Sequence, residues 1–185
     1  INTQLVPDLR SPQGTSTLVV NQGEAKVDGL EVEITSALSE SLTLSMAYTY
    51  LDPRFTESDV PNTSALGIAG SGNCRLGTVG HQTVCFTNTN GNQMEQSNKH
   101  AFVSTLAYRR DLTNGWRLNS DLAFQKRSKR YTSPDNLVYL PAYTQVDARV
   151  GVENDRYNVL LYVNNLLDDD TVRSSQSYGD PFIAF

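Results

Sequence analysis

A strict two-residue alternation of apolar and polar side chains, sustained over long runs, is the feature that most constrains this sequence. Between residues 28 and 38, Leu30, Val32 and Ile34 alternate with glycine, glutamate and threonine. Successive side chains of a β-strand point to opposite faces, so this pattern predicts a strand with one apolar and one polar face. The alternation restarts after a short polar turn and continues to Tyr50, which predicts a β-hairpin.

The same alternation predicts two further hairpins. One turns at 112–115 and the other at 154–156, while the long polar segments 53–97 and 127–141 separate the hairpins. Each predicted strand holds about 11–13 residues, which suits a tilted crossing of a bilayer better than a globular sheet. Short turns on one side and long loops on the other are typical of bacterial outer-membrane barrels. We therefore predict an all-β fold, an antiparallel meander of long transmembrane strands within a large outer-membrane β-barrel.

Composition is compatible with this prediction and excludes other classes. Apolar residues make up 38% of the chain, and no run approaches the roughly 18 apolar residues of a transmembrane helix. A net charge of −5 argues against a nucleic-acid partner, because phosphate binding needs a basic surface. No leader is visible at Ile1, so we expect either a removed signal peptide or a start inside a longer protein.

Aromatic residues are expected to mark both membrane interfaces, where amphipathic rings are favoured. If the short turns are periplasmic, Tyr108, Trp116 and Tyr157 lie near that side. The residues expected near the long-loop side are Tyr48, Tyr50, Phe102, Phe124 and Tyr143.

Ionisable residues recur on the polar side of the predicted strands and are candidate lumen-facing groups. In a barrel this side would face a wet or plugged lumen, whereas in a soluble sandwich it would face solvent. These candidates are Glu31, Glu33, Arg117, Asp121, Asp147, Arg149 and Glu153.

Two segments resemble the barrels of TonB-dependent receptors. The run NQGEAKVDGLEVE at 21–33 resembles their N-x-G-x-A-x-x-x-G-x-E-x-E pattern. The run YNVLLYVNNLLD at 157–168 resembles the v-x-l-x-v-x-N-L-x-D pattern of their penultimate strand. Weaker similarity at 42–55 and 107–116 extends the resemblance over about residues 16–170.

The resemblance implies a plugged barrel of about 22 strands, of which this sequence supplies six and a possible partial strand near Ile1–Leu5. We therefore expect residues 1–185 to be a C-terminal barrel segment. The plug domain is expected to be absent, and Asp180–Phe185 is too short to supply the final closing strand.

The same resemblance implies residence in the outer membrane of a Gram-negative bacterium, in contact with outer-membrane lipid. Its implied function is uptake of a scarce ligand, such as a metal chelate, cobalamin or a glycan, energised by TonB through the missing N-terminal part. Two alternatives stay open: a passive porin-like small barrel and a soluble secreted β-sandwich binding module.

Cys74 and Cys85 lie close together in the longest polar segment and are expected to form a disulfide. The alternative is a metal site with His81 and, as a further ligand, His100, but the spacing lacks the paired cysteines of structural zinc sites. We predict no metal and no cofactor. No recognisable nucleophile, phosphate loop or catalytic carboxylate arrangement occurs either, so no enzyme is predicted.

Two charged runs complete the candidates. One run could contact an anionic ligand or lipopolysaccharide phosphates, or could be a solvated loop tip, and comprises Lys126, Arg127, Lys129 and Arg130. The other, 168–170, lacks the alternating oxygen ligands of a calcium loop and is expected to be a solvated strand end.

Overall fold

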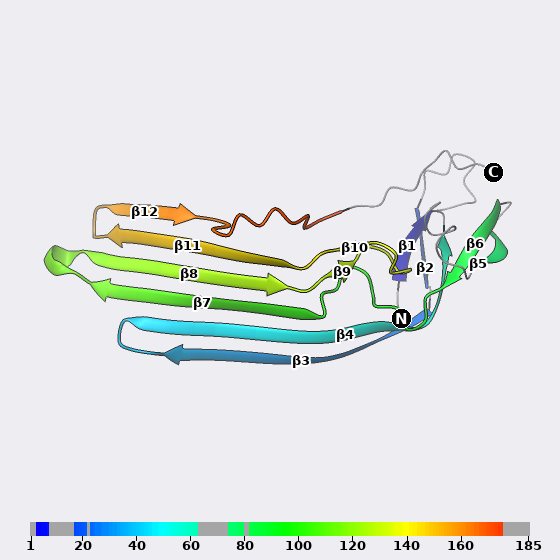
Figure 1. The fold of residues 1–185 in the computed structure, drawn as a ribbon, viewed down its shortest axis with the longest axis horizontal. Coiled ribbons are helices and arrows are strands. Elements are labelled where there is room, and N and C mark those ends of the chain that lie inside the picture. The colour runs from blue at the N-terminus through cyan, green and yellow to red at the C-terminus, as the bar shows by residue number, and fades with distance from the viewer. Residues whose placement is uncertain (1–2, 8–16, 22, 63–73, 80–81, 176–185) are drawn as a thin grey trace.

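A computed structural model describes residues 3–7, 17–21, 23–62, 74–79 and 82–175. In this part of the chain the main sheet has eight strands, six of which follow one another as an antiparallel meander (Figure 1). These are β3 (Gly23–Ala37), β4 (Leu42–Asn62), β7 (His100–Asp111), β8 (Arg117–Arg127), β11 (Tyr143–Glu153) and β12 (Asn158–Val163). The predicted all-β antiparallel meander and its three hairpins are confirmed.

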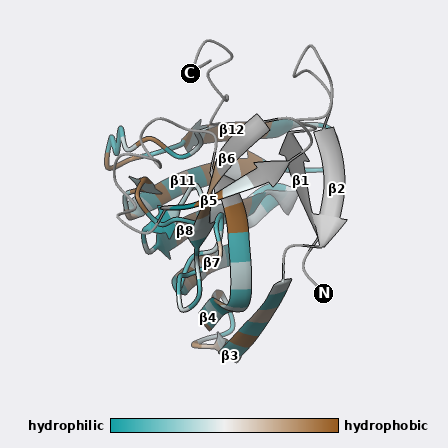
Figure 2. Ribbon diagram, turned by 90° about the vertical axis from the view of Figure 1, so that its right-hand side faces the viewer, coloured by the Kyte–Doolittle hydropathy of each residue, from teal (hydrophilic) through white to brown (hydrophobic). Residues whose placement is uncertain are grey.

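The three short turns of the meander lie together at one end of the sheet (Figure 1). The central turn contains a short 3-10 helix, η1 (Thr113–Gly115), in which Asn114 and Gly115 have φ of 61° and 74°. Asparagine and glycine tolerate this left-handed conformation better than other residues, which explains their place in the turn. Viewed along the strands in Figure 2, the meander follows an arc rather than a flat plane.

The long polar segments 53–97 and 127–141 contain further strands that the sequence did not predict. β4 continues to Asn62, and β5 (Cys74–Val79) and β6 (Gln82–Asn88) form a hairpin that pairs with this extension. The second segment contains the short pair β9 (Arg130–Tyr131) and β10 (Tyr139–Leu140). Past the membrane-length part of β4, Phe55 and Val60 are buried while Arg54 and Asp59 are exposed, and the alternation shifts by one residue at the bulge between them.

A small separate sheet accounts for the expected partial strand at the start of the chain. β1 (Thr3–Pro7) pairs with β2 (Thr17–Asn21) rather than with the meander. Residues 180–185, where a closing strand was expected to be absent, lie outside the described residues, as does His81.

Cross-strand register gathers the apolar residues on one face of the meander, because directly opposed residues point the same way. Leu30 opposes Tyr50, Ile34 opposes Met46, and Leu106 opposes both Leu44 and Leu122. We call this the apolar face, and it comprises Leu30, Val32, Ile34, Leu44, Met46, Leu106, Leu122, Val146, Val150 and Leu161.

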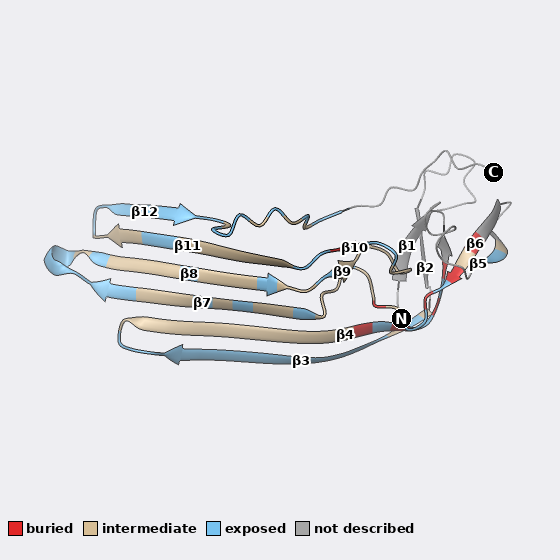
Figure 3. Cartoon of the chain, in the orientation of Figure 1, coloured by how far each residue is buried: buried red, intermediate tan, exposed pale blue. Residues whose placement is uncertain are grey.

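The apolar face is uncovered in the described part of the chain. Leu30, Leu122, Val150 and Leu161 are 57%, 45%, 44% and 68% exposed. Among the described residues, the buried ones lie at the long-loop end, in the extension of β4 and the segments beside it (Figure 3). An exposed apolar surface of this length is favourable only against an apolar environment, such as lipid hydrocarbon.

The predicted aromatic bands are partly realised. Tyr48 opposes Phe102 on the apolar face, and Phe124 packs edge-on against Phe102 with ring centroids 5.8 Å apart. Tyr143 instead opposes Arg127, so its assignment to the band is wrong. Its position differs by an odd number, three, from that of Val146 on the apolar face, which places it on the opposite face.

The structure explains one glycine of the receptor-like motif, Gly23. Its φ is +126°, and a Cβ there would lie 1.7 Å from the carbonyl oxygen of Glu57. The register of β3 and β4 shifts directly afterwards, between Glu24 and Ala25. Only glycine fits where the two backbones approach so closely at a bulge.

The register of β5 and β6 also brings the two cysteine positions near each other. Cys74 opposes Thr87, and Cys85 opposes Leu76, so the cysteines are diagonal neighbours in the hairpin. Cys85 is buried, and no free cysteine occurs among the described residues. The disulfide stays a prediction.

A thiol assay tests this disulfide. Unreduced, denatured protein is expected to contain no reactive thiol, and reduction is expected to release two. Loss of the crosslink should weaken the β5–β6 hairpin, because a loop of this size gains roughly 2–3 kcal/mol from closure. Two thiols without reduction would exclude the bridge.

Substitutions at Val150 test the assignment of the apolar face to lipid. In the full-length protein, Val150→Arg is expected to lower the folded fraction, because arginine near the bilayer midplane costs roughly 2–4 kcal/mol. Val150→Leu should be tolerated. Ala123→Arg is the matched control, since Ala123 opposes Asp147 on the other face. Heat-modifiable gel migration measures the folded fraction, and equal tolerance of both arginines would contradict the assignment.

Candidate functional site

The face opposite the apolar face, which we call the polar face, carries all the candidate lumen residues. Asp121 opposes Arg149, and Arg117 opposes Glu153 with 3.8 Å between the charged groups. The register places the other candidates, Glu31, Glu33 and Asp147, on the same side. That this face lines a lumen stays a prediction.

Two arginines gather at the long-loop end of the polar face. The guanidinium of Arg173 lies 4.7 Å above the ring of Tyr143 and donates a hydrogen bond to Gln145. Gln125 donates to the Tyr143 hydroxyl at 3.0 Å. Arg127 directly opposes Tyr143, and its buried Nε has no acceptor among the described residues. We call these five residues the arginine cluster.

The chain after β12 continues alongside β11 and is bonded to it before it reaches Arg173. The backbone N–H of Asn165 donates to Asp147 at 2.8 Å, and that of Thr144 donates to Asp169 at 2.8 Å. Asn165 and Asp169 also bond each other twice, with both distances 3.1 Å. We call these bonds the Asp169 clasp. They hold the backbone a few residues before Arg173 and so limit the positions that the Arg173 side chain can reach.

Asp169 corrects the expectation that 168–170 is only a solvated strand end. Its carboxylate accepts hydrogen bonds from the hydroxyl of Thr171 and from the backbone N–H groups of Thr144 and Thr171. These donors favour the ionised form and lower the pKa of Asp169 to about 2. The NNLLDDD run therefore has a capping role that its spacing alone did not reveal.

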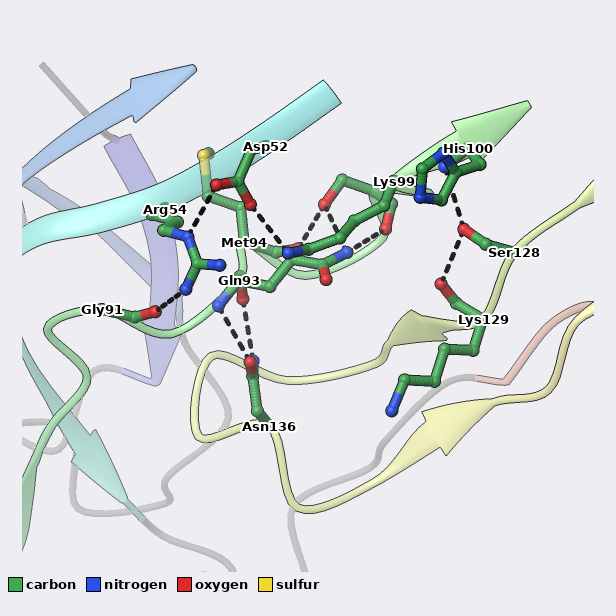
Figure 4. Close-up of polar contacts among 11 residues, drawn as sticks. Asp52, Arg54, Gly91, Gln93, Met94, Lys99, His100, Ser128, Lys129 and Asn136 are labelled. Carbon is green, nitrogen blue, oxygen red and sulfur yellow. Dashed lines mark hydrogen bonds and ion pairs between the residues drawn. The ribbon is translucent and has the colours of Figure 1, made fainter. Parts of the chain in front are cut away.

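A second polar site lies beyond the apolar face, at the long-loop end. It is a cavity of about 440 Å³. Figure 4 draws several of the residues that line it. We call it the rim pocket, and it is lined by Arg54, Gly91, Asn92, Gln93, Lys99, His100, Ser128, Lys129, Tyr131 and Asn136.

An ion-pair network organises one wall of the rim pocket. Asp52 accepts from Arg54 at 2.9 Å and from Lys99 at 2.8 Å (Figure 4). These two cations lower the pKa of Asp52, beyond the membrane-length part of β4, to about 2. Arg54 also donates to the carbonyl of Gly91 at 2.8 Å, which ties the loop to the strand. Two cations share one carboxylate, so this wall keeps a net positive charge.

The structure divides the predicted basic run between the two faces. Lys126 opposes Phe102 on the apolar face, whereas Arg127 points to the polar face. Lys129 lies 5.2 Å above the rings of both Tyr131 and Tyr139 and lines the rim pocket. Arg130 opposes the buried Leu140 and donates to the carbonyl of Arg173. The four residues therefore form two groups rather than one patch.

His100 belongs to the rim pocket. Its ring stacks on Tyr48 and contacts Tyr50, and its Nδ1 lies 2.8 Å from the Tyr48 hydroxyl. Within the described ranges no group of three His, Cys, Asp or Glu side chains could hold a metal ion. No helix found there is long and apolar enough to cross a membrane.

Several residues of these two sites were not predicted from the sequence. Arg54, Lys99 and Arg173 lie in segments without clear alternation, so their direction could not be read from the sequence. The tandem Lys99-His100 immediately before a strand was the one available signal for the rim pocket.

Comparisons with known proteins bear on this geometry. The family model described as TonB dependent receptor-like, beta-barrel matches residues 2–166. The probable TonB-dependent siderophore receptor PiuA of Acinetobacter baumannii is 30% identical over 156 residues, which cover 82% of this chain and 18% of that protein.

Solved structures show a similar fold. The ferric yersiniabactin uptake receptor FyuA from Yersinia pestis aligns with a TM-score of 0.60 at 20% identity, over 82% of this chain and 20% of that one. The siderophore receptor PiuA from A. baumannii aligns with a TM-score of 0.53 at 26% identity, over 82% and 19%. The chain thus spans about a fifth of the length of these relatives.

The Asp169 clasp has an expected pH dependence. A carboxyl whose pKa is lowered in the folded state stabilises that state above its ordinary pKa, near 3.8, and loses this effect as pH falls towards about 2. Hydrogen-exchange protection at 164–175, measured relative to the intrinsic rate at each pH, should therefore fall between about pH 4 and pH 2.

Asp169→Asn supplies the control for this measurement. It keeps the side-chain shape but removes the charge, so protection at 164–175 should be lower at neutral pH and should change less between about pH 4 and pH 2. An equal pH response in the variant and the natural protein would assign the effect to another carboxyl.

Proposed function

Because the chain belongs to the TonB-dependent receptor family and forms part of its β-barrel, we propose that the intact protein imports an iron chelate, energised by TonB. Members of this family are transport receptors of the Gram-negative outer membrane rather than enzymes. The chain covers only about a fifth of its relatives, so this activity is proposed for the whole receptor.

The observation that carries this proposal is the arrangement of the meander. Its long strands present one uncovered apolar face and one face rich in ionisable groups. A barrel wall needs this division, because one side meets lipid hydrocarbon and the other meets a wet or plugged lumen. We accordingly propose that outer-membrane lipid contacts the apolar face.

An iron chelate is favoured over cobalamin and glycans for two reasons. The relative found by sequence is named a siderophore receptor, and the two solved structures are named as siderophore and ferric yersiniabactin receptors. The arginine cluster also suits an anion, because Arg127 has a buried donor without an acceptor in the described part of the chain. Ferric chelates built on hydroxyl and carboxyl donors commonly carry negative charge, which guanidinium groups recognise well.

The alternatives receive less support. A passive small barrel would have to close on itself, whereas both β3 and β12 pair on one side only within the described residues. A soluble β-sandwich would need a second layer over Leu30, Leu122 and Val150, which are all largely exposed. Coupling to TonB is proposed to act through the receptor's plug rather than through these strands.

Uptake of radiolabelled ferric chelates tests the proposed function. Cells that express the full-length receptor under iron limitation should accumulate the label, and loss of TonB should abolish accumulation. Uptake that persists without TonB would favour a passive pore. Accumulation of cobalamin or a glycan in place of iron would keep the receptor assignment and overturn the iron chelate.

Variants of the arginine cluster localise the ligand. Arg127→Gln combined with Arg173→Gln should weaken chelate binding at least about ten-fold, since hydrogen bonds to charged groups contribute roughly 1.5–3 kcal/mol each. Arg109→Gln is the matched control, because Arg109 lies on the same face near the short turns. Equal weakening by the control would indicate a general charge effect.

A further inference from the structure

We propose that a band of cations on the lipid-facing side of the sheet binds the phosphate groups of lipopolysaccharide in the outer leaflet. We call this band the basic rim, and it consists of Lys126, Lys129, Arg54 and Lys99. The inference rests on the apolar face meeting lipid and does not depend on which ligand the receptor imports.

The register places the basic rim on the side of the apolar face. Lys126 opposes Phe102, which opposes Tyr48, which opposes Val32 of the apolar face. Arg54 follows Tyr50 by four residues without a register shift, so both side chains point to the same side. Alternate residues of a strand share a face, and therefore these cations lie above the lipid-facing residues and not in the lumen.

The ammonium groups of Lys99 and Lys129 reach the same side through their contacts. Lys99 pairs with Asp52, which lies between Tyr50 and Arg54 on the same face of β4. Lys129 and Lys99 line the rim pocket together with His100, whose ring contacts Tyr50 (Figure 4). Residues from three segments far apart in the sequence thus converge at one rim.

The order of residues along the strands matches the layers of a membrane interface. On this face of β8, Leu122 is followed by Phe124 and then by Lys126. On β4, Tyr50 is followed by Asp52 and Arg54. This order, from apolar residues through aromatic rings to cations, is expected where acyl chains meet anionic headgroups.

The cations of the basic rim are available to an anion. Lys126 and Lys129 are exposed, and no ion pair found in the described segments includes either of them. Arg54 and Lys99 share the single carboxylate of Asp52. By contrast, Arg127 is half-buried on the polar face, and the half-buried Arg130 donates to the carbonyl of Arg173.

The rim pocket gives a phosphate group a place to sit. Its volume of about 440 Å³ exceeds that of one phosphate, and its lining adds neutral donors such as Ser128 to the cations. Lipid A carries phosphates on its sugar headgroup, directly above its acyl chains. A phosphate held here would leave those chains along the apolar face, where Phe102 and Phe124 lie.

Binding of purified lipid A to the full-length receptor in detergent tests the proposal. The probe is hexa-acylated diphosphoryl lipid A, detected by native mass spectrometry. Lys126→Gln combined with Lys129→Gln should weaken binding about 25-fold, or roughly five-fold for each lysine near an anionic headgroup. Lys129→Gln alone, which lies outside the long strands, is the second variant and should weaken binding about five-fold.

The matched control removes the same charge from the other face. Arg109→Gln combined with Arg149→Gln should leave lipid A binding unchanged, because both residues are exposed on the polar face. Dephosphorylated lipid A should bind the natural protein as weakly as lipid A binds the double lysine variant. Unchanged binding by both lysine variants, or equal loss in the control, would overturn the proposal.

Two further arms separate the possible sources of the phosphate. Inorganic phosphate at matched ionic strength should displace lipid A only weakly, because it lacks acyl chains, and full displacement would show a site for soluble anions instead. Chelate uptake by the double lysine variant separates this proposal from the proposed function. Retained uptake with lost lipid A binding would support the basic rim. Failed uptake by both the natural protein and the double lysine variant would overturn the proposed imported ligand and leave the basic rim unaffected.

Discussion

Cross-strand pairing is the constraint on which the rest of this structure depends. A strand surrounded by hydrocarbon has no water to satisfy its N–H and C=O groups, so each must pair with a neighbouring strand. Pairing fixes the register, and the register fixes the direction of every side chain, because a slip of one residue would move the whole apolar set to the wrong face. In this chain β8 pairs with both neighbours along its full length, from Arg117 to Arg127. The two faces of the sheet therefore stay chemically distinct.

This dependence explains how much of the fold the sequence could predict. Alternation in β3 and the first part of β4 is nearly strict, so the hairpin, its turn and its two faces followed from residue types alone. Alternation also placed Glu31 and Asp121 on a common side. Tyr143 was misplaced because the prediction used its distance from the loops and ignored its parity within β11. The position of a residue along a strand therefore does not determine which face of the sheet its side chain points to.

The long-loop end could not be predicted in the same way, because its order comes from contacts between distant segments. The Asp169 clasp depends on Thr144, and the Arg54–Asp52–Lys99 network joins β4 to a loop that follows it by more than thirty residues. Neither leaves a periodic trace. The basic run at 126–130 was unpredictable for the same reason. Its four neighbouring cations resembled one patch in the sequence, but the structure places them in two separate groups.

The edges of the sheet show what the described strands still require. Within the described residues β3 pairs only with β4, and β12 only with β11, so each has one side of unpaired backbone. Leu160, Leu161 and Tyr162 of β12 are all more than half exposed, although consecutive residues point to opposite faces. Such an edge is costly in hydrocarbon, where each unpaired group costs several kcal/mol. We therefore propose that further strands flank β3 and β12 in the membrane, as expected for a chain that covers about a fifth of its relatives. Closure of the barrel, rather than any core within these residues, then provides the stability of the wall.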